Sequence, residues 1–248
     1  MIYEEFRPAP PLIDIVSSYW RFALPSSHEP PVMQHAIPPD GAVNLCWVPP
    51  GRTVIVGPRV TALRVPVHAG AEYLGARFLP GAGGSILGIS ISSLRDAVIR
   101  FESDAFASAI AERGLAGIEG VLLDHVARDG WKGPDTTVVE LARRIVECDG
   151  ALPVSALVAG LNVSYRQVLR RFREAAGLTP KEFARLRRLR AASLQAVRST
   201  ELRWADVSAD TGFSDQSHLS REFQDVYGWP PRLVHEYLRR IEHRTLDA

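Results

Sequence analysis

Cysteine is scarce in this sequence, with only Cys46 and Cys148 among 248 residues. Two cysteines are too few for a disulfide framework, and their spacing matches no metal site. No apolar run approaches the ~20 residues that a membrane span needs. The first residues, MIYEEFRPAPP, lack the basic start and the apolar stretch of a secretory signal. We therefore expect a cytoplasmic protein in a reducing compartment, with no membrane partner.

Positive charge is unevenly distributed, and in the C-terminal part it is almost entirely arginine. Residues 1–150 hold 13 Lys and Arg against 17 Asp and Glu, whereas residues 151–248 hold 16 against 11, and 15 of those 16 are Arg. Arginine suits phosphate and guanine better than lysine does, and a basic region suits a polyanion. A net charge of this size is more often found on domains that are merely soluble than on domains that bind nucleic acid. The sequence motifs must therefore distinguish these two cases.

Short runs separated by Gly and Pro predict a mainly β region over residues 1–90. Val43, Leu45 and Trp47 alternate with their neighbours at the period of a half-buried strand. Further strands are predicted at 53–56, 65–67 and 72–78. From Ser92 onward the period becomes helical, and helices are predicted at 92–101, 104–112 and 117–127. The segment WKGPD at 131–135 is predicted to be a linker.

Residues 136–248 are predicted to be entirely helical, with strong signals at the helix starts. Ser164 and Gln167 form a Ser-x-x-Gln capping box. Thr179 and Glu182 flank Pro180 in the same arrangement, which predicts a long helix over about 181–198. The core side of this helix is predicted from apolar spacings of three and four: Phe183, Leu186, Leu189, Ala192 and Ala196.

An internal repeat with an offset of 51 residues relates two parts of this helical region. Phe172 falls on Phe223 and Arg170 on Arg221, and the Gly and Pro that follow also coincide. Each copy reads as a short helix, a turn and a second helix, which is the helix-turn-helix arrangement. The linking helix spans roughly 27 Å at ~1.5 Å per residue, so the two second helices could lie about one DNA turn, ~34 Å, apart. A helical bundle with duplicated hairpins is the alternative for the repeat alone.

The second helices, at about 164–176 and 215–226, carry outward side chains of the types that read bases. Arginine pairs with guanine and glutamine with adenine through two hydrogen bonds, and helix starts offer backbone N–H groups to phosphates. Leu219 and Phe223 are predicted to face the core of the second motif. His218 and Trp229 are interpreted as capping or packing residues. The predicted base-reading side chains are Arg166, Arg170, Gln216, Ser217, Ser220 and Arg221.

The segment GFSDQSHLSREFQDVYGWPPRLVHEY resembles the C-terminal signature of the AraC/XylS family of bacterial transcription regulators. The match covers about residues 150–240. It implies an α+β protein of two domains, with motif 1 at about 153–177, the linking helix at about 181–198 and motif 2 at about 201–228. It also implies double-stranded DNA as partner, RNA polymerase as a second partner if the protein is an activator, and Leu169 as a further base contact. Leu169 could meet a thymine methyl or simply pack.

The N-terminal half resembles, more loosely, a small group of domains fused to this DNA-binding unit. Its landmarks are Tyr3, the Tyr19–Trp20 pair and the segments 38–47, 56–59 and 75–84. The resemblance implies that residues 1–135 form a sensing or oligomerisation domain, mainly β and cupin-like, with trailing helices, and that residues 136–248 form the DNA-binding domain. A small-molecule effector and a homodimer are implied as partners, without a defined ligand.

The motifs of catalysis are missing from residues 1–135. A cupin metal site would need a His-x-His pair and a following Glu, but His28, His35 and His68 are isolated. PGAGG at 80–84 lacks the residues of a phosphate loop, and neither G-x-S-x-G nor H-E-x-x-H occurs. We expect no catalytic site, metal or cofactor. Two alternatives stay open: a small-molecule-binding protein or cupin-like enzyme with a helical scaffold, and a DNA-binding regulator without a ligand.

Overall fold

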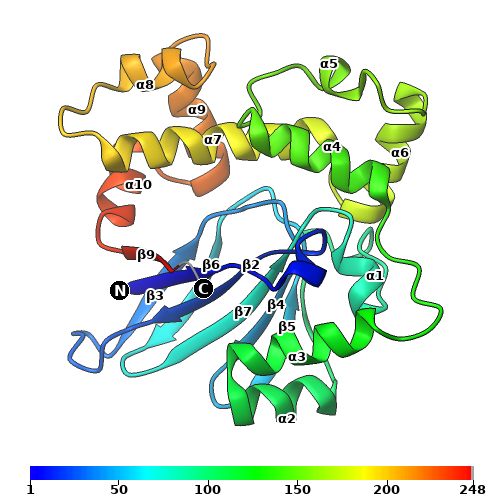
Figure 1. The fold of residues 1–248 in the computed structure, drawn as a ribbon. Coiled ribbons are helices and arrows are strands. Elements are labelled where there is room, and N and C mark those ends of the chain that lie inside the picture. Colours follow the sequence, from blue (N-terminus) through cyan, green and yellow to red (C-terminus); the bar gives the residue numbers. More distant parts are fainter. Residues whose placement is uncertain (247–248) are drawn as a thin grey trace.

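Strands dominate the first hundred residues, as the short alternating runs predict. The computed structural model describes residues 1–246 (Figure 1). A seven-stranded sheet has the order β8-β5-β4-β7-β2-β1-β9, and β3 pairs with β6 in a separate sheet. The strands of residues 1–100 are β1 (Ile2–Phe6), β2 (Val16–Ala23), β3 (Val32–Ile37), β4 (Asn44–Val48), β5 (Arg52–Val56), β6 (Leu63–His68), β7 (Glu72–Phe78) and β8 (Val98–Arg100).

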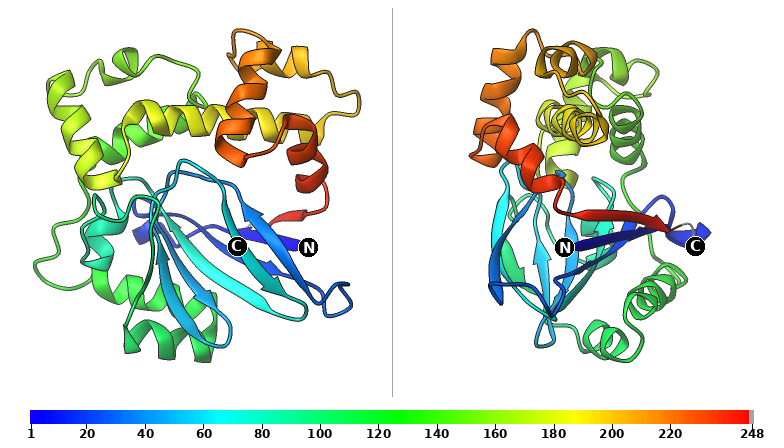
Figure 2. Two further views of the ribbon diagram at one scale, coloured as in Figure 1. Left: turned by 180° about the vertical axis from the view of Figure 1, so that it is seen from behind. Right: turned by 90° about the vertical axis from the view of Figure 1, so that its left-hand side faces the viewer.

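One face of the large sheet is covered by α1 (Gly83–Leu87), α2 (Asp104–Arg113) and α3 (Leu115–Val126), as the views in Figure 2 show. Leu45 and Ile55 point to this side and are fully buried with Ile118 of α3. Because side chains alternate along a strand, their neighbours in β4 and β5 face the other side, toward the β3–β6 pair. The helices predicted at 104–112 and 117–127 are confirmed.

Residues 92–101 correct the sequence prediction of a helix. Val98–Arg100 form β8, which pairs with β5. Asp96 has a φ of 56°, a left-handed conformation that ends any right-handed helix. The open edge of β5 supplies hydrogen-bond partners for this backbone, and such a long-range gain outweighs the local helical spacing. The prediction for this segment is therefore wrong.

The C-terminal part is helical up to residue 238, and its predicted helix starts are confirmed. Ser164 and Gln167 form a reciprocal capping box, as do Thr179 and Glu182. The long linking helix is present with all five predicted apolar positions buried. The helices are α4 (Thr136–Glu147), α5 (Val154–Val158), α6 (Tyr165–Ala176), α7 (Pro180–Arg198), α8 (Trp204–Asp210), α9 (Gln216–Tyr227) and α10 (Pro231–Leu238).

The helix α7 divides the helical part into two cores. Phe183 and Ala184, near its start, pack with Phe172 and the rest of the first motif. Leu189 and Ala192, further along, pack with the second motif. Each helix-turn-helix therefore has its own apolar centre, and one rigid helix holds the two at a fixed separation.

The prediction that residues 136–248 are all helix fails at one place. Glu242–Leu246 form a strand, β9, which runs parallel to β1 with Ile2 opposite Glu242. The backbone of β1 would otherwise be an open edge of the sheet, and pairing satisfies its hydrogen-bonding groups. The segment EHRTL is too short and too polar for its periodicity to reveal a strand, so only tertiary structure could show it.

Candidate nucleic-acid interface

The second helix of motif 2, α9, is built to expose its first turns. Asp215 caps it by accepting a hydrogen bond of 2.7 Å from the backbone N–H of His218. Leu219 and Phe223 are buried at 0% and 1% exposure, which confirms their predicted core role. The ring of His218 packs edge-on against Phe213. His218 is thus a residue of the cap and the packing, as interpreted from the sequence.

The predicted base readers of α9 lie on its outer face. Gln216, Ser217 and Arg221 are exposed, and Ser220 is half-buried. Arg221 makes no hydrogen bond or ion pair within residues 1–246. Its guanidinium is therefore available to an external acceptor, and an arginine can present two parallel N–H groups to a guanine or a phosphate.

The second helix of motif 1, α6, presents a matching surface. Arg166 and Arg170 are exposed, while Val168 and Phe172 are fully buried beneath them. Arg170 donates to both carboxylate oxygens of Glu174 at 2.9 Å, one turn further along the same helix.

Leu169 is half-buried in the structure. It therefore combines packing with a partly exposed methyl surface, and both sequence interpretations of it stay open.

The two helices are oriented alike with respect to the rest of the molecule. In Figure 1, α6 and α9 begin on the side away from the sheets and run toward them. Their ends, at Gly177 and Gly228, lie against Pro58 and Arg64 of the N-terminal part. The exposed first turns therefore point away from the sheets. The 19 residues of α7 between the motifs span about 28 Å at ~1.5 Å per residue.

A cavity of about 410 Å³ lies between the two sheets of the N-terminal part. The alternate side chains of β4 and β5 that do not face the helices line it, among them Cys46 and Val54. Burial, and then the charge of Asp40, raise the pKa of the Cys46 thiol to about 12, so this thiol stays neutral. Sequence reasoning did not find this cavity. The alternation in 44–48 and 52–56 was its only signal, and alternation alone does not show what a face contacts.

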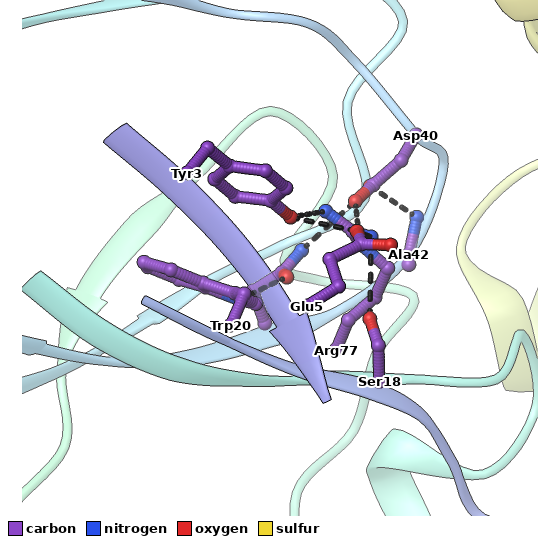
Figure 3. A network of polar contacts seen from close by, with 8 residues as sticks. Tyr3, Glu5, Ser18, Trp20, Asp40, Ala42 and Arg77 are labelled. Carbon is purple, nitrogen blue, oxygen red and sulfur yellow. Dashed lines mark hydrogen bonds and ion pairs between the residues drawn. The ribbon is translucent and has the colours of Figure 1, made fainter. Parts of the chain in front are cut away.

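In the cavity wall, Arg77 of β7 ties its own strand to β1, to the segment with Asp40 and, through a bond of 3.4 Å to the Ser18 hydroxyl, to β2 (Figure 3). It donates to Glu5 and to Asp40 at 2.6 Å, and to the hydroxyl of Tyr3 at 3.0 Å. Tyr3 in turn donates to Glu5 at 2.7 Å. Burial raises the pKa of Glu5, but the charge of Arg77 and these hydrogen bonds lower it more, so its pKa lies below the ordinary value. Glu5 is therefore an ionised carboxylate held by its partners.

A second polar contact joins the cavity wall to the helical part. The Tyr237 hydroxyl accepts a hydrogen bond of 2.9 Å from the backbone N–H of Ala36 and forms a second hydrogen bond, of 2.5 Å, with Nδ1 of His35. Burial, together with the charged N-terminus, lowers the pKa of His35 to about 4. His35 is therefore neutral near pH 7, and its ring joins the cavity wall to α10 in that form.

Acidification is expected to weaken the folded state through His35. The pKa of His35 in the folded protein is below its ordinary value of about 6.5. Its contribution to the free energy of unfolding is therefore complete above pH ~6.5 and is lost as the pH falls toward 4. The loss is at most about 3 kcal/mol. Urea unfolding between pH 7 and 4 measures this, with His35→Gln as the comparison because glutamine offers an uncharged acceptor. Equal losses in both proteins would contradict the role of His35.

Neither a metal centre nor a membrane segment is found in the part of the chain that the structure describes. Within residues 1–246, His, Cys, Asp and Glu do not gather in any group of three that could hold a metal ion. None of the described helices combines the length and apolarity needed to cross a bilayer.

Comparison with known proteins agrees with this geometry. A family described as a helix-turn-helix domain matches residues 157–239, and a domain of unknown function, DUF6597, matches residues 4–100. The transcriptional activator NphR of Rhodococcus sp. is 31% identical over 166 residues, which are 65% of this chain and 48% of NphR. The HTH-type transcriptional activator RhaS of Escherichia coli is 32% identical over 82 residues, 33% of this chain and 29% of RhaS.

The C-terminal part of the chain is therefore a helix-turn-helix domain of the AraC type. The match to a domain of unknown function covers residues 4–100, most of the region in which the looser resemblance was found. The chain spans about half or less of the length of the curated relatives named here. Among solved structures, ToxT from Vibrio cholerae is similar over 89% of this chain and 95% of its own, with 11% identity and a TM-score of 0.46.

Proposed function

We propose that this protein is a sequence-specific transcription regulator that binds double-stranded DNA and is not an enzyme. The observation that carries the proposal is the pair of capped helices, α6 and α9, whose exposed first turns carry base-reading side chains at equivalent places of a repeat. One rigid helix of 19 residues joins the two motifs, and its length of about 28 Å, with the flanking turns, suits a spacing of about one turn of DNA, ~34 Å. A single chain then suffices to enter two successive major grooves on one side of the duplex.

The side chains take distinct roles in this proposal. Arg166, Arg170 and Arg221 each present a guanidinium that suits the O6 and N7 of guanine, and Gln216 suits adenine. Ser217 and Ser220 hydrogen-bond to either base or phosphate. Leu169 is assigned to a thymine methyl. The capped helix starts add backbone N–H groups for phosphates.

The other parts of the molecule supply regulation. We assign residues 1–135 to a domain that responds to a small molecule and can join two copies, and residues 136–248 to DNA binding. The names of NphR and RhaS as activators support contact with RNA polymerase, and the site of action is then the cytoplasm. A regulator that binds DNA without any ligand is the second candidate.

Selection of bound sequences from a random DNA pool tests the function. We expect an asymmetric motif of two blocks with centres about one helical turn apart, and a further inverted or tandem copy if the protein dimerises. Affinity for the selected site should fall with salt, with a logarithmic slope of roughly −0.9 per phosphate contacted. Electrophoretic or fluorescence titration at several salt concentrations measures that slope.

The same selection with residues 136–248 provides the control. Enrichment by this fragment alone would mean that the N-terminal domain holds the protein in an inactive state. If neither form enriched any sequence, the regulator hypothesis would be rejected. The small-molecule-binding protein or enzyme with a helical scaffold would then be the better account.

A further inference from the structure

The cavity between the sheets has walls suited to an apolar molecule. Val54 of β5 and Val65 and Val67 of β6 line it from opposite sides, and Trp20 and Phe22 of β2 contribute aromatic surface. Ligand sites of this kind are mostly apolar, with a few polar groups that fix orientation. The polar groups at the cavity therefore decide which ligand it prefers.

The charge balance of the cavity favours an anion. Three arginines line it, Arg52, Arg59 and Arg77, against one carboxylate, Asp40. Arg77 is already paired with Asp40 and with Glu5, each at 2.6 Å, so Arg52 and Arg59 carry the positive balance. Within residues 1–246, Arg59 has no carboxylate partner and donates only to the backbone carbonyls of Thr61 and Asp96. A half-buried guanidinium that has only neutral partners gains most from a carboxylate, because charge-assisted hydrogen bonds are the stronger kind.

Arg59 belongs to a segment that also reaches both recognition helices. We name residues 57–64, the connection from β5 together with the first two residues of β6, the bridging segment. Pro58 lies against Gly177, the end of α6, so closely that a Cβ there would be 2.6 Å from its ring. Further along the segment, the N–H of Ala62 donates to the carbonyl of Val226 at 2.8 Å, at the end of α9.

Arg64 completes this contact with motif 2. Its guanidinium donates to the Tyr227 carbonyl at 3.2 Å and lies 4.8 Å from the ring centre of Trp229. The last carbonyls of a helix have no partner within the helix, so these bonds fix the end of α9 to the bridging segment. One stretch of eight residues thus contacts the cavity, the end of α6 and the end of α9.

We propose that the cavity binds an apolar carboxylic acid through Arg59, and that the bridging segment transmits its presence to both recognition helices. The acid competes with the carbonyls of Thr61 and Asp96 for the guanidinium and so frees the segment to shift. A shift changes the support of α6 and α9 at their ends, and with it their relative placement on DNA. The binding half stands alone, whereas the regulatory half rests on the proposed DNA-binding function.

Calorimetric titration of the full chain with matched probes tests the binding half. The probes are 4-phenylbutyrate and decanoate, each beside its alcohol, 4-phenylbutanol and decanol. We expect the acids to bind about tenfold or more tightly than the alcohols, as one charge-assisted hydrogen bond implies. Arg59→Gln should abolish that preference, and Arg52→Gln, at an exposed cavity arginine, should keep it.

Three results would overturn the binding half: no acid binds, the alcohols bind equally well, or Arg59→Gln retains the preference. Val54→Phe, which places a larger side chain in the apolar part of the cavity, should weaken the binding of acids and alcohols alike. Its thermal unfolding identifies a fold defect. A loss of preference in Arg52→Gln alone would move the acid to the other end of the cavity and refute the role of Arg59.

Titration of the selected DNA site with and without the acid tests transmission. The wild type should change its DNA affinity several-fold when the acid is bound. Arg64→Met, which lacks the bond to Tyr227, should bind the acid normally while its DNA affinity responds less. An unchanged affinity in an acid-binding wild type would overturn transmission. A chain that binds no DNA in either state would refute the proposed function and transmission together, and the calorimetric result would still decide acid binding.

Discussion

Replacing Arg77 by methionine is expected to lower the free energy of unfolding by about 3 kcal/mol. This is the lower end of the range for removing one partner of a buried ion pair, ~3–5 kcal/mol, because 21% of the Arg77 side chain remains exposed. Methionine keeps much of the volume but leaves Glu5 and Asp40 without their cation. Urea unfolding followed by circular dichroism measures the loss.

Two controls separate the charge network from packing. Arg100→Met removes an arginine that is 71% exposed, and its effect should stay within about 0.5 kcal/mol. Adding Glu5→Gln and Asp40→Asn to Arg77→Met should recover part of the loss, since no uncompensated carboxylate then remains. If Arg77→Met lowered the free energy of unfolding only about as much as Arg100→Met does, the charge network would contribute little to stability.

The network also predicts a pH dependence. The folded pKa of Glu5 is lowered, so its contribution is complete above the ordinary glutamate value of about 4.3 and is lost as the pH falls through the folded value. Arg77→Met should lose less stability over this range than the wild type does, because its Glu5 no longer prefers the ionised form.

Replacing Arg170 or Arg221 by alanine is expected to reduce affinity for the selected DNA site by about 1–3 kcal/mol each, with the loss confined to one base pair. Arg170 must leave Glu174 to reach a base, but an exposed pair of this kind is worth only ~0.3–0.5 kcal/mol. The gain from two hydrogen bonds to guanine is larger. Binding curves for the selected site and its single-base variants give the loss at each position.

The matched control is Arg100→Ala, which removes the same charge from the N-terminal sheet. It should leave both affinity and base preference unchanged. If Arg170→Ala or Arg221→Ala weakened every DNA sequence equally, the side chain would contact phosphate and the base-reading role would be wrong. The salt slope would then be smaller by about one phosphate.

The helix-turn-helix part could be predicted from the sequence because its signals are local. Capping boxes, Pro at helix starts and apolar spacing each involve residues within one or two turns of each other, and α6 and α7 begin where these signals place them. The repeat then related the two motifs. Residues 92–101 and 242–246 were mispredicted because each segment contains a strand, β8 or β9, whose partner, β5 or β1, is distant in sequence.

The N-terminal site could be predicted only as a set of landmarks. Tyr3, the segment with Asp40, the segment with Arg59 and the segment with Arg77 were all singled out, yet nothing local shows that they meet. The bond between Arg64 and the Tyr227 carbonyl joins residues 163 positions apart. Such contacts depend on how the sheets close over one another, and a single sequence does not encode that in any period or motif.

The parallel pairing of β9 with β1 has a consequence for synthesis on the ribosome. Chains emerge from the N-terminus, and domains generally fold in that order. Here the edge of the first sheet stays open until residues 242–246 have emerged, after both helix-turn-helix motifs have been made. The nascent N-terminal domain therefore waits with an exposed strand edge, which is a site for mispairing. Completion of that sheet coincides with the arrival of the helical C-terminal part against it.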